Sequence, residues 1–187
     1  MWKRISDWLH QVSTGWVALF ALVVFLSFSA LVLPGQAARA ETYTRNAGSP
    51  DMSFYYSADD LYQMAELYGK QGRAAYVRTR FTFDLIFPLV YTMFLGTAIS
   101  WVSVKAFRPD SQWQRTNLVP VLGALFDYLE NLSTSLVMVR YPNHTSVVDV
   151  LAPVFSLVKW ALVSGSFVLL LAGAVVGVWQ WNKRRAG

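Results

Sequence analysis

The sequence contains no cysteine and few charged residues. Without cysteine the chain forms no disulfide, no thiolate metal site and no cysteine nucleophile. Charged residues make up 14% of the 187 residues, whereas soluble domains carry about a quarter. Hydrophobic residues make up 55%. This combination, arranged in long uncharged runs, is typical of an integral membrane protein with the lipid bilayer as its first partner.

Histidine and the common catalytic motifs are also scarce. The two histidines, His10 and His144, flank apolar runs and are expected near opposite membrane faces. Haem or zinc sites built on paired histidines are therefore disfavoured, and no cofactor is predicted. The chain has no H-E-x-x-H, G-x-S-x-G or P-loop pattern. No basic groove with interleaved aromatic residues occurs, so nucleic acid is not an expected partner.

The long apolar runs predict an all-α fold. We expect a four-helix transmembrane bundle formed by a single domain, residues 1–187. The predicted spans are about 14–34, 81–107, 117–140 and 153–181. The polar segment 35–80 is predicted to lie outside the cytoplasm. It includes a loop near Gly48 and an aromatic cluster, Phe54 to Tyr56, suited to the headgroup level.

The outer segment contains an amphipathic helix. Ser57 followed by Asp60 predicts an N-cap, and Gly69 or Gly72 a helix end, with a further helix starting near Arg73. An apolar stripe is formed by Leu61, Met64, Ala65 and Tyr68. A lid packed on the bundle is the favoured interpretation. Ligand gating and partner docking are the alternatives.

The first apolar run has a rival interpretation as a secretory signal. A basic start, an apolar core and small residues at Ala38 and Ala40 resemble a cleavage site. The core, Gly15–Leu33, is longer than a usual signal core, so we expect a retained span that ends at Pro34.

Flanking charges predict the topology. If four helices cross, eight basic residues share one side, and Arg140 alone occupies the short loop on the other. The eight are Lys3, Arg4, Lys105, Arg108, Arg115, Lys183, Arg184 and Arg185. Both termini are therefore predicted to be cytoplasmic, in a plasma or inner membrane.

The third predicted span carries two carboxyl groups near its midpoint. Asp127, Glu130 and Asn131 share one helical face, which Thr134 extends by a turn. An ionisable group at mid-bilayer costs at least about 2.5–3.5 kcal/mol. Such groups normally face a partner or a wet cavity.

Two other spans offer partners for these carboxyls. At about 1.5 Å per residue, Asp84 and Lys159 lie about 33–35 Å from the cytoplasmic boundary. The carboxyls of the third span lie at about 21–26 Å. The levels meet if helices tilt or if the long Lys159 side chain reaches inward. The predicted ligand-binding residues are Asp84, Tyr91, Asp127, Glu130, Asn131 and Lys159.

Three functions fit these residues. A pocket open to the outside would bind a small or lipid-like ligand, with a carboxylate neutralising a cation and Tyr91 covering an apolar part. A structural network would pair Lys159 with Glu130 or Asp127, and Asp84 with Arg80 or Arg78, as in an accessory subunit of a larger membrane complex. An enzyme would use Asp127 and Glu130 in acid–base chemistry or hold a divalent cation, although no catalytic residue is assigned.

Small residues predict close helix packing. Thr92, Gly96, Ser100 and Ser103 form a stripe, and Pro88 is expected to kink the same helix. Gly173 and Gly177 form a G-x-x-x-G pair, for which internal packing is favoured over dimerisation. The layout of spans, outer segment and intramembrane carboxyls resembles that of emopamil-binding and sigma-2-receptor-like membrane proteins. No motif matches residue by residue, so the resemblance implies no site.

Overall fold

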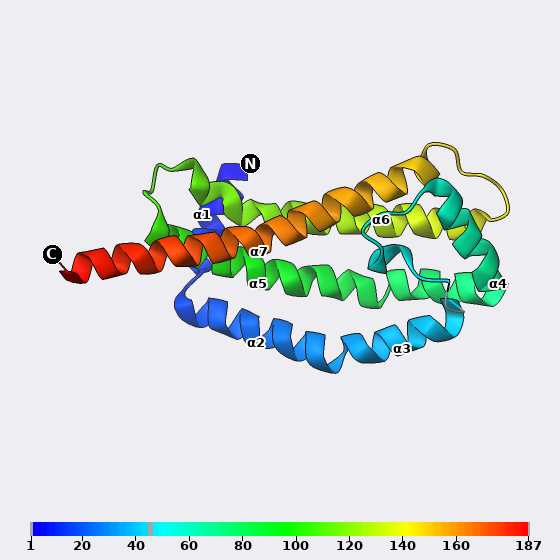
Figure 1. The fold of residues 1–187 in the computed structure, drawn as a ribbon, viewed down its shortest axis with the longest axis horizontal. Helices are drawn as coiled ribbons and strands as arrows, with labels where there is room; N and C mark the ends of the chain where they lie inside the picture. The colour runs from blue at the N-terminus through cyan, green and yellow to red at the C-terminus, as the bar shows by residue number, and fades with distance from the viewer. Residues whose placement is uncertain (1, 45–46, 187) are drawn as a thin grey trace. The chain divides into compact units, whose positions relative to one another are not determined.

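The computed structural model describes residues 2–44 and 47–186, and within these ranges it contains helices and no strand (Figure 1). The all-α prediction is confirmed. The elements, in chain order, are α1 Trp2–Val12, α2 Gly15–Leu31, α3 Leu33–Thr44, the 3-10 helix η1 Pro50–Met52, α4 Ala58–Arg80, α5 Phe83–Ala106, the 3-10 helix η2 Gln112–Leu118, α6 Val119–Arg140 and α7 Val148–Ala186.

Within the described ranges, three helical runs are long and apolar enough to cross a membrane. They are Gly15–Thr44, Ala58–Ala106 and Val148–Arg185. The third predicted span corresponds to α6, which is not among the three. Asp127, Glu130 and Asn131 lower its hydropathy. The structure is therefore compatible with a membrane protein, whereas the fourth span stays a prediction.

The polar segment after the first span is more helical than predicted. α2 ends at Leu31, before Pro34, but the chain re-enters a helix in α3 and stays helical to Thr44. Pro34 is the second residue of α3, where its missing N–H leaves no helical hydrogen bond unmade. The alanine-rich sequence that follows favours helix. Pro34, where the first span is predicted to end, therefore does not end the helical run.

The N-cap and the break predicted for the outer helix are both present in α4. Ser57 and Asp60 form a capping box in which each side chain accepts from the backbone of the other. Gly69 leaves the helical conformation at φ 63° and ψ 179°, which kinks α4. The Arg73 guanidinium donates to the carbonyl of Ala65 at 2.7 Å, which gives a partner to a backbone group beside the kink. The helix then continues to Arg80.

α7 is longer at both ends than the predicted span, 153–181. It has 39 residues, or about 58 Å at 1.5 Å per residue, whereas the hydrocarbon core is about 30 Å thick. Pro153 lies inside it without ending it. α6 ends at Arg140, immediately before Tyr141 and Pro142, as predicted.

The chain divides into two compact units, which we describe separately. Unit 1 contains Met1–Leu26, Val90–Gly123 and Ala161–Gly187, and unit 2 contains Ser27–Leu89 and Ala124–Trp160. α2, α5, α6 and α7 each contribute to both units. The prediction that one domain contains the whole chain stays a prediction.

Unit 1 packs parts of α2, α5 and α7 through aromatic rings. Phe25 stacks on Phe94 with ring centroids 5.1 Å apart, and both contact Phe167. Such offset aromatic pairs add to the free energy of burial. Gly173 of α7 lies so close to Val102 of α5 that a Cβ at Gly173 would stand 2.9 Å from a Val102 methyl. This contact within one chain fits the internal packing predicted for the glycine pair.

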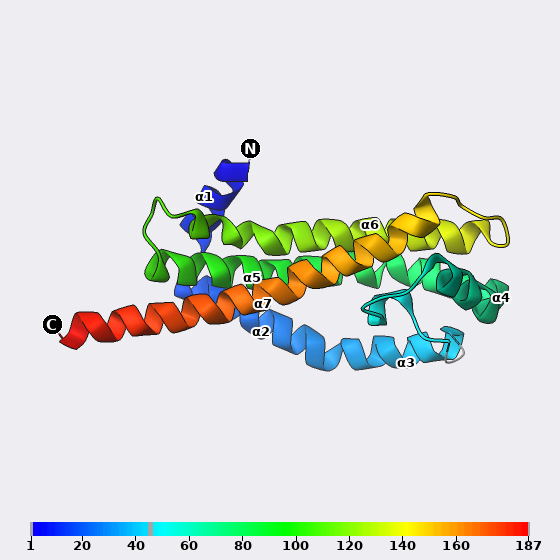
Figure 2. The ribbon, with the colours of Figure 1, turned by 45° about the horizontal axis from the view of Figure 1, so that its top comes forward.

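A buried polar group ties α1 and η2 to α5 in unit 1. The fully buried Asn117 side chain accepts from the Ser6 hydroxyl at 2.8 Å and donates to the Ser100 hydroxyl at 3.0 Å. Thr92 donates to the carbonyl of Pro120 at 3.2 Å. Figure 2 shows α1 beside the segment that joins α5 to α6. The predicted stripe of small residues on α5 therefore faces the chain leading into α6.

Unit 2 is organised around a core that α4 and α6 share. The stripe residues Leu61, Ala65 and Tyr68 are buried as predicted. They pack with Tyr76, further along α4, and with side chains from outside this helix: Tyr56, Val137, Met138 and Ala152. The close approach of α3 to α4 depends on Gly72, because a Cβ there would stand 2.5 Å from the Tyr43 carbonyl oxygen.

Candidate functional site

Glu130 lies at the centre of the candidate site and is completely buried. Its Oε2 lies 2.5 Å from the Lys159 Nζ of α7, and Lys159 is itself 5% exposed. Its Oε1 accepts a hydrogen bond of 3.2 Å from the Tyr56 hydroxyl. The Lys159 side chain therefore reaches the carboxyl of α6, as the sequence prediction required. Both carboxylate oxygens are therefore engaged.

Arg80, at the end of α4, forms a second centre in the same unit. It is paired with Asp51 of η1, lies 3.0 Å from the carboxylate of Asp84, and donates to the Asn131 side chain at 3.4 Å. The Tyr76 ring lies 4.5 Å from the guanidinium carbon, so the cation also has an aromatic face. Arg80 and Asn131 are 5% exposed. The hydrogen bond from Arg80 to Asn131 joins the charged residues of α4 and α5 to α6.

Helical spacing explains how α6 presents three of these groups. Asp127, Glu130 and Asn131 lie on one face, and the Asn131 amide donates to the Asp127 carboxylate at 3.4 Å. The group around Arg80 and the pair of Glu130 and Lys159 lie in the same unit and meet at neighbouring positions of α6, and we call them together the charge network. Its members are Asp51, Arg80, Asp84, Asp127, Glu130, Asn131 and Lys159.

The charge network contains more acidic than basic groups. Three of its carboxylates, Asp51, Asp84 and Glu130, face two cations, Arg80 and Lys159. Asp127 is a fourth, half-buried carboxyl. A net charge held away from water is expensive unless a proton or a counter-charge balances it. The composition of the network therefore favours a proton or a cationic group.

Several buried polar atoms in or near the network have no hydrogen-bond partner among residues 2–44 and 47–186. They include the Nε of Arg80, the Oδ1 of Asp51 and the hydroxyl of Tyr76. Tyr76 is fully buried and faces Thr134 without a well-formed hydrogen bond. Buried polar groups normally have partners, so these atoms mark where water or a polar ligand would bind.

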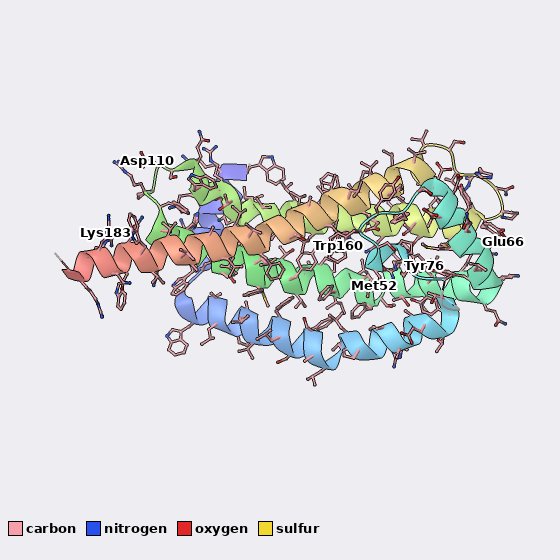
Figure 3. The ribbon with its side chains drawn as sticks, viewed as in Figure 1. Met52, Glu66, Tyr76, Asp110, Trp160 and Lys183 are labelled. Atoms are coloured by element: carbon pink, nitrogen blue, oxygen red, sulfur yellow. The ribbon has the colours of Figure 1, made fainter. Side chains whose placement is uncertain are left out.

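Aromatic side chains flank the network. The rings of Phe54 and Trp160 lie 4.9 Å apart, and the Lys159 ammonium lies 5.2 Å from the Trp160 ring. The Trp160 indole nitrogen is buried and finds no hydrogen-bond partner in the part of the chain that the structure describes. Figure 3 shows Tyr76 and Trp160 in the same part of unit 2. These rings provide an apolar surface beside the charges.

Tyr56 shows what the sequence prediction missed. The sequence predicts a headgroup-level position for Tyr56 together with Phe54 and Tyr55, but Tyr56 is buried against Glu130 while its two neighbours are exposed. Burial, and secondly the Glu130 carboxylate, raise the pKa of the Tyr56 phenol, so it stays protonated and donates. Hydropathy does not separate three adjacent aromatic residues. The Asp51 contact with Arg80 left no signal in the sequence either.

The remaining predicted site residues have different outcomes. Asp84, Asp127, Glu130, Asn131 and Lys159 all belong to unit 2 and to the charge network. Tyr91 belongs to unit 1, where it is buried. Among the described residues, no three acidic or histidine side chains are grouped as a metal ion requires, so the divalent-cation hypothesis gains no support.

The chain matches no known protein family, no characterised protein and no solved structure. The site's own chemistry is therefore the basis for any functional proposal.

Proposed function

We propose that this chain is a multi-pass membrane protein whose charge network binds a small or lipid-like ligand carrying a positive charge. In this proposal α2, α5, α6 and α7 form a four-helix transmembrane bundle with both termini in the cytoplasm. The observation that carries the proposal is the excess of carboxylates over cations in the network. A bound cation would balance that excess at lower cost than an uncompensated buried charge.

The surface pattern of α6 supports a fourth span. Its polar residues Glu130, Asn131 and Thr134 are buried, whereas its apolar residues Leu132, Leu136 and Val139 are exposed. A helix in water buries its apolar face, and a helix in lipid exposes it. The carboxyls that lower the hydropathy of α6 are therefore directed into the protein, where their partners lie.

The flanking aromatic rings support a ligand with an apolar part. Phe54 is exposed and touches Trp160, so one edge of this aromatic surface is accessible from outside unit 2. A quaternary or primary ammonium binds favourably over such rings as well as to carboxylates. A long-chain amine combines both features.

The proposal is tested with a matched pair of amphiphiles, dodecylamine and dodecanol, which differ in the charged head. We expect dodecylamine to raise the thermal unfolding temperature in detergent at pH 7 and dodecanol to raise it less. Asp51→Asn and Asp127→Asn should each reduce this difference, because each removes one carboxylate. The ion pairs Arg80–Asp84 and Glu130–Lys159 remain in both variants. The control is Asp110→Asn, an exposed carboxylate of unit 1.

The rival function is that of an accessory subunit in which the network only holds helices together. The sealed pair of Glu130 and Lys159 favours this rival, since neither group is open to a ligand. If both amphiphiles shift the unfolding temperature equally in the wild type and in all three variants, the binding proposal is wrong and the structural role stands.

A further inference from the structure

Unit 1 contains a cavity of about 560 Å³ formed by the C-terminal parts of α5 and α7. Its walls combine aromatic, apolar and basic residues. Those that matter here are Trp101, Lys105, Gly177, Gln180, Trp181 and Arg184. A volume of this size accommodates part of a drug-sized molecule or of a lipid.

The charged residues that line the cavity are Lys105 and Arg184. The surrounding unit has the same sign: the sequence of unit 1 contains eight Lys or Arg and two Asp. One of these aspartates, Asp110, pairs with the exposed Arg108. Figure 3 shows Asp110 and Lys183 toward one end of this unit. The cavity is therefore complementary to an anion.

Other walls of the cavity suit a hydrocarbon chain. Val102 and Val178 contribute apolar surface, and Trp101 and Trp181 contribute indole rings. Tryptophan is enriched where membrane proteins meet the headgroup region of the bilayer. The Lys105 ammonium lies 4.0 Å from the Trp101 ring, which holds the cation at this wall. A ligand with an anionic head and an apolar tail complements both the basic residues and the apolar walls of the cavity.

Two α7 residues shape the cavity. The Gln180 amide donates to the carbonyl of Ala106 at 2.7 Å, so it occupies an acceptor at the end of α5 that would repel an anion. A Cβ at Gly177 would meet no other described residue within 4 Å, whereas a Cβ at Gly173 would meet Val102. Within the glycine pair, Gly173 therefore serves packing and Gly177 leaves space open.

We infer that this cavity binds an anionic phospholipid, with the phosphate between Lys105 and Arg184 and an acyl chain along Val102 and Val178. The inference concerns a site in unit 1 and does not rest on the ligand proposed for the charge network. The preference for an anionic headgroup over a zwitterionic one is about thirtyfold in affinity, from two basic residues near the phosphate.

The test measures lipid binding to the full chain by native mass spectrometry from detergent. The probes are dioleoyl phosphatidylglycerol, dioleoyl phosphatidylcholine and soluble glycerol phosphate. We expect the wild type to retain phosphatidylglycerol about thirtyfold more tightly than phosphatidylcholine. Glycerol phosphate should not displace it, because a free phosphate lacks the acyl chain.

Two matched pairs of variants locate the binding. Gly177→Leu places a side chain in the cavity and should abolish the preference, whereas Gly165→Leu, also without a neighbour within 4 Å, should preserve it. Replacing Lys105 and Arg184 together by Gln should also abolish the preference for phosphatidylglycerol. Replacing Arg108 and Arg115 by Gln removes equal charge from outside the cavity and should preserve the preference.

The inference is overturned if the two lipids bind equally well to the wild type. It is also overturned if glycerol phosphate displaces the lipid, which would indicate a free-anion site, or if both members of a pair behave alike. Circular dichroism of each variant establishes that it is folded. If Gly177→Leu does not fold, the comparison of the Lys105/Arg184 and Arg108/Arg115 double variants decides whether the lipid binds in the cavity.

Discussion

The pair of Glu130 and Lys159 gives the sharpest energetic prediction. Both side chains are buried, and their charged atoms lie 2.5 Å apart. Lys159→Met removes the ion-pair partner of a buried carboxylate, and Glu130→Gln removes the ion-pair partner of a buried ammonium. Removing one partner of a buried ion pair costs about 3–5 kcal/mol of unfolding free energy. We expect each single variant to lose this amount.

The double variant with both replacements behaves differently. It contains no unpaired charge at these two positions, and the Gln side chain still accepts from the Tyr56 hydroxyl. Replacing both members of a buried pair is often close to neutral. We therefore expect the double variant to lie within about 1 kcal/mol of the wild type, so that the coupling energy is at least about 5 kcal/mol.

The assay is reversible unfolding by sodium dodecyl sulfate in mixed micelles, followed by circular dichroism. Arg108 and Asp110 provide the control cycle, because their atoms are 3.9 Å apart and their side chains are 89% and 82% exposed. The control coupling should be below about 1 kcal/mol. Single variants of the buried pair that each cost less than about 1 kcal/mol, or that add without coupling, would refute the reasoning.

Three further predictions concern packing, capping and topology. Gly72→Ala should cost about 1–3 kcal/mol in the same unfolding assay, because its Cβ would stand 2.5 Å from a carbonyl oxygen of α3, whereas Gly35→Ala has open space and should cost nothing similar. Ser57→Ala should cost about 0.5–2 kcal/mol through loss of the capping box, and Ser57→Thr should retain most of that energy. In this cysteine-free chain, Gln112→Cys should react with an impermeant maleimide from the cytoplasm and Ser146→Cys from the opposite side.

Each of these has a contrary outcome. A Gly72→Ala protein as stable as the Gly35→Ala protein would contradict the close approach of α3 and α4. Unchanged stability of the Ser57→Ala protein would contradict a stabilising role for the capping box. Labelling of both new cysteines from the same side would contradict the topology, since α6 would then not cross the bilayer.

The sequence was most informative where chemistry restricted the choices. Lys159 had two candidate partners and Asp84 had two, and the structure pairs them with Glu130 and Arg80 respectively. Charges in apolar helices have few alternatives, so these pairings could be predicted. The break at Gly69 followed in the same way, because glycine readily adopts a positive φ.

Contacts made by the outer segment could not be predicted. Asp51 reaches Arg80 from a short 3-10 helix, and Tyr56 reaches Glu130 from a loop, across 74 positions of sequence. Neither contact leaves a periodic pattern. The helix α3 could not be predicted, because proline and glycine after an apolar run indicate a helix end, although proline also fits a helix's first turn. Local helix propensity is therefore a weak predictor of whether a helix ends or continues at a proline.

The central claim is that the charge network takes a cationic group to balance its excess carboxylates. Isothermal titration calorimetry of dodecylamine against the full chain in detergent micelles tests it most directly. We predict one saturable binding event at pH 7 that is weakened at least about tenfold by Asp51→Asn or Asp127→Asn and unchanged by Asp110→Asn. Equal dodecylamine affinity in the wild type and all three variants, or equal affinity for dodecanol, would contradict the claim.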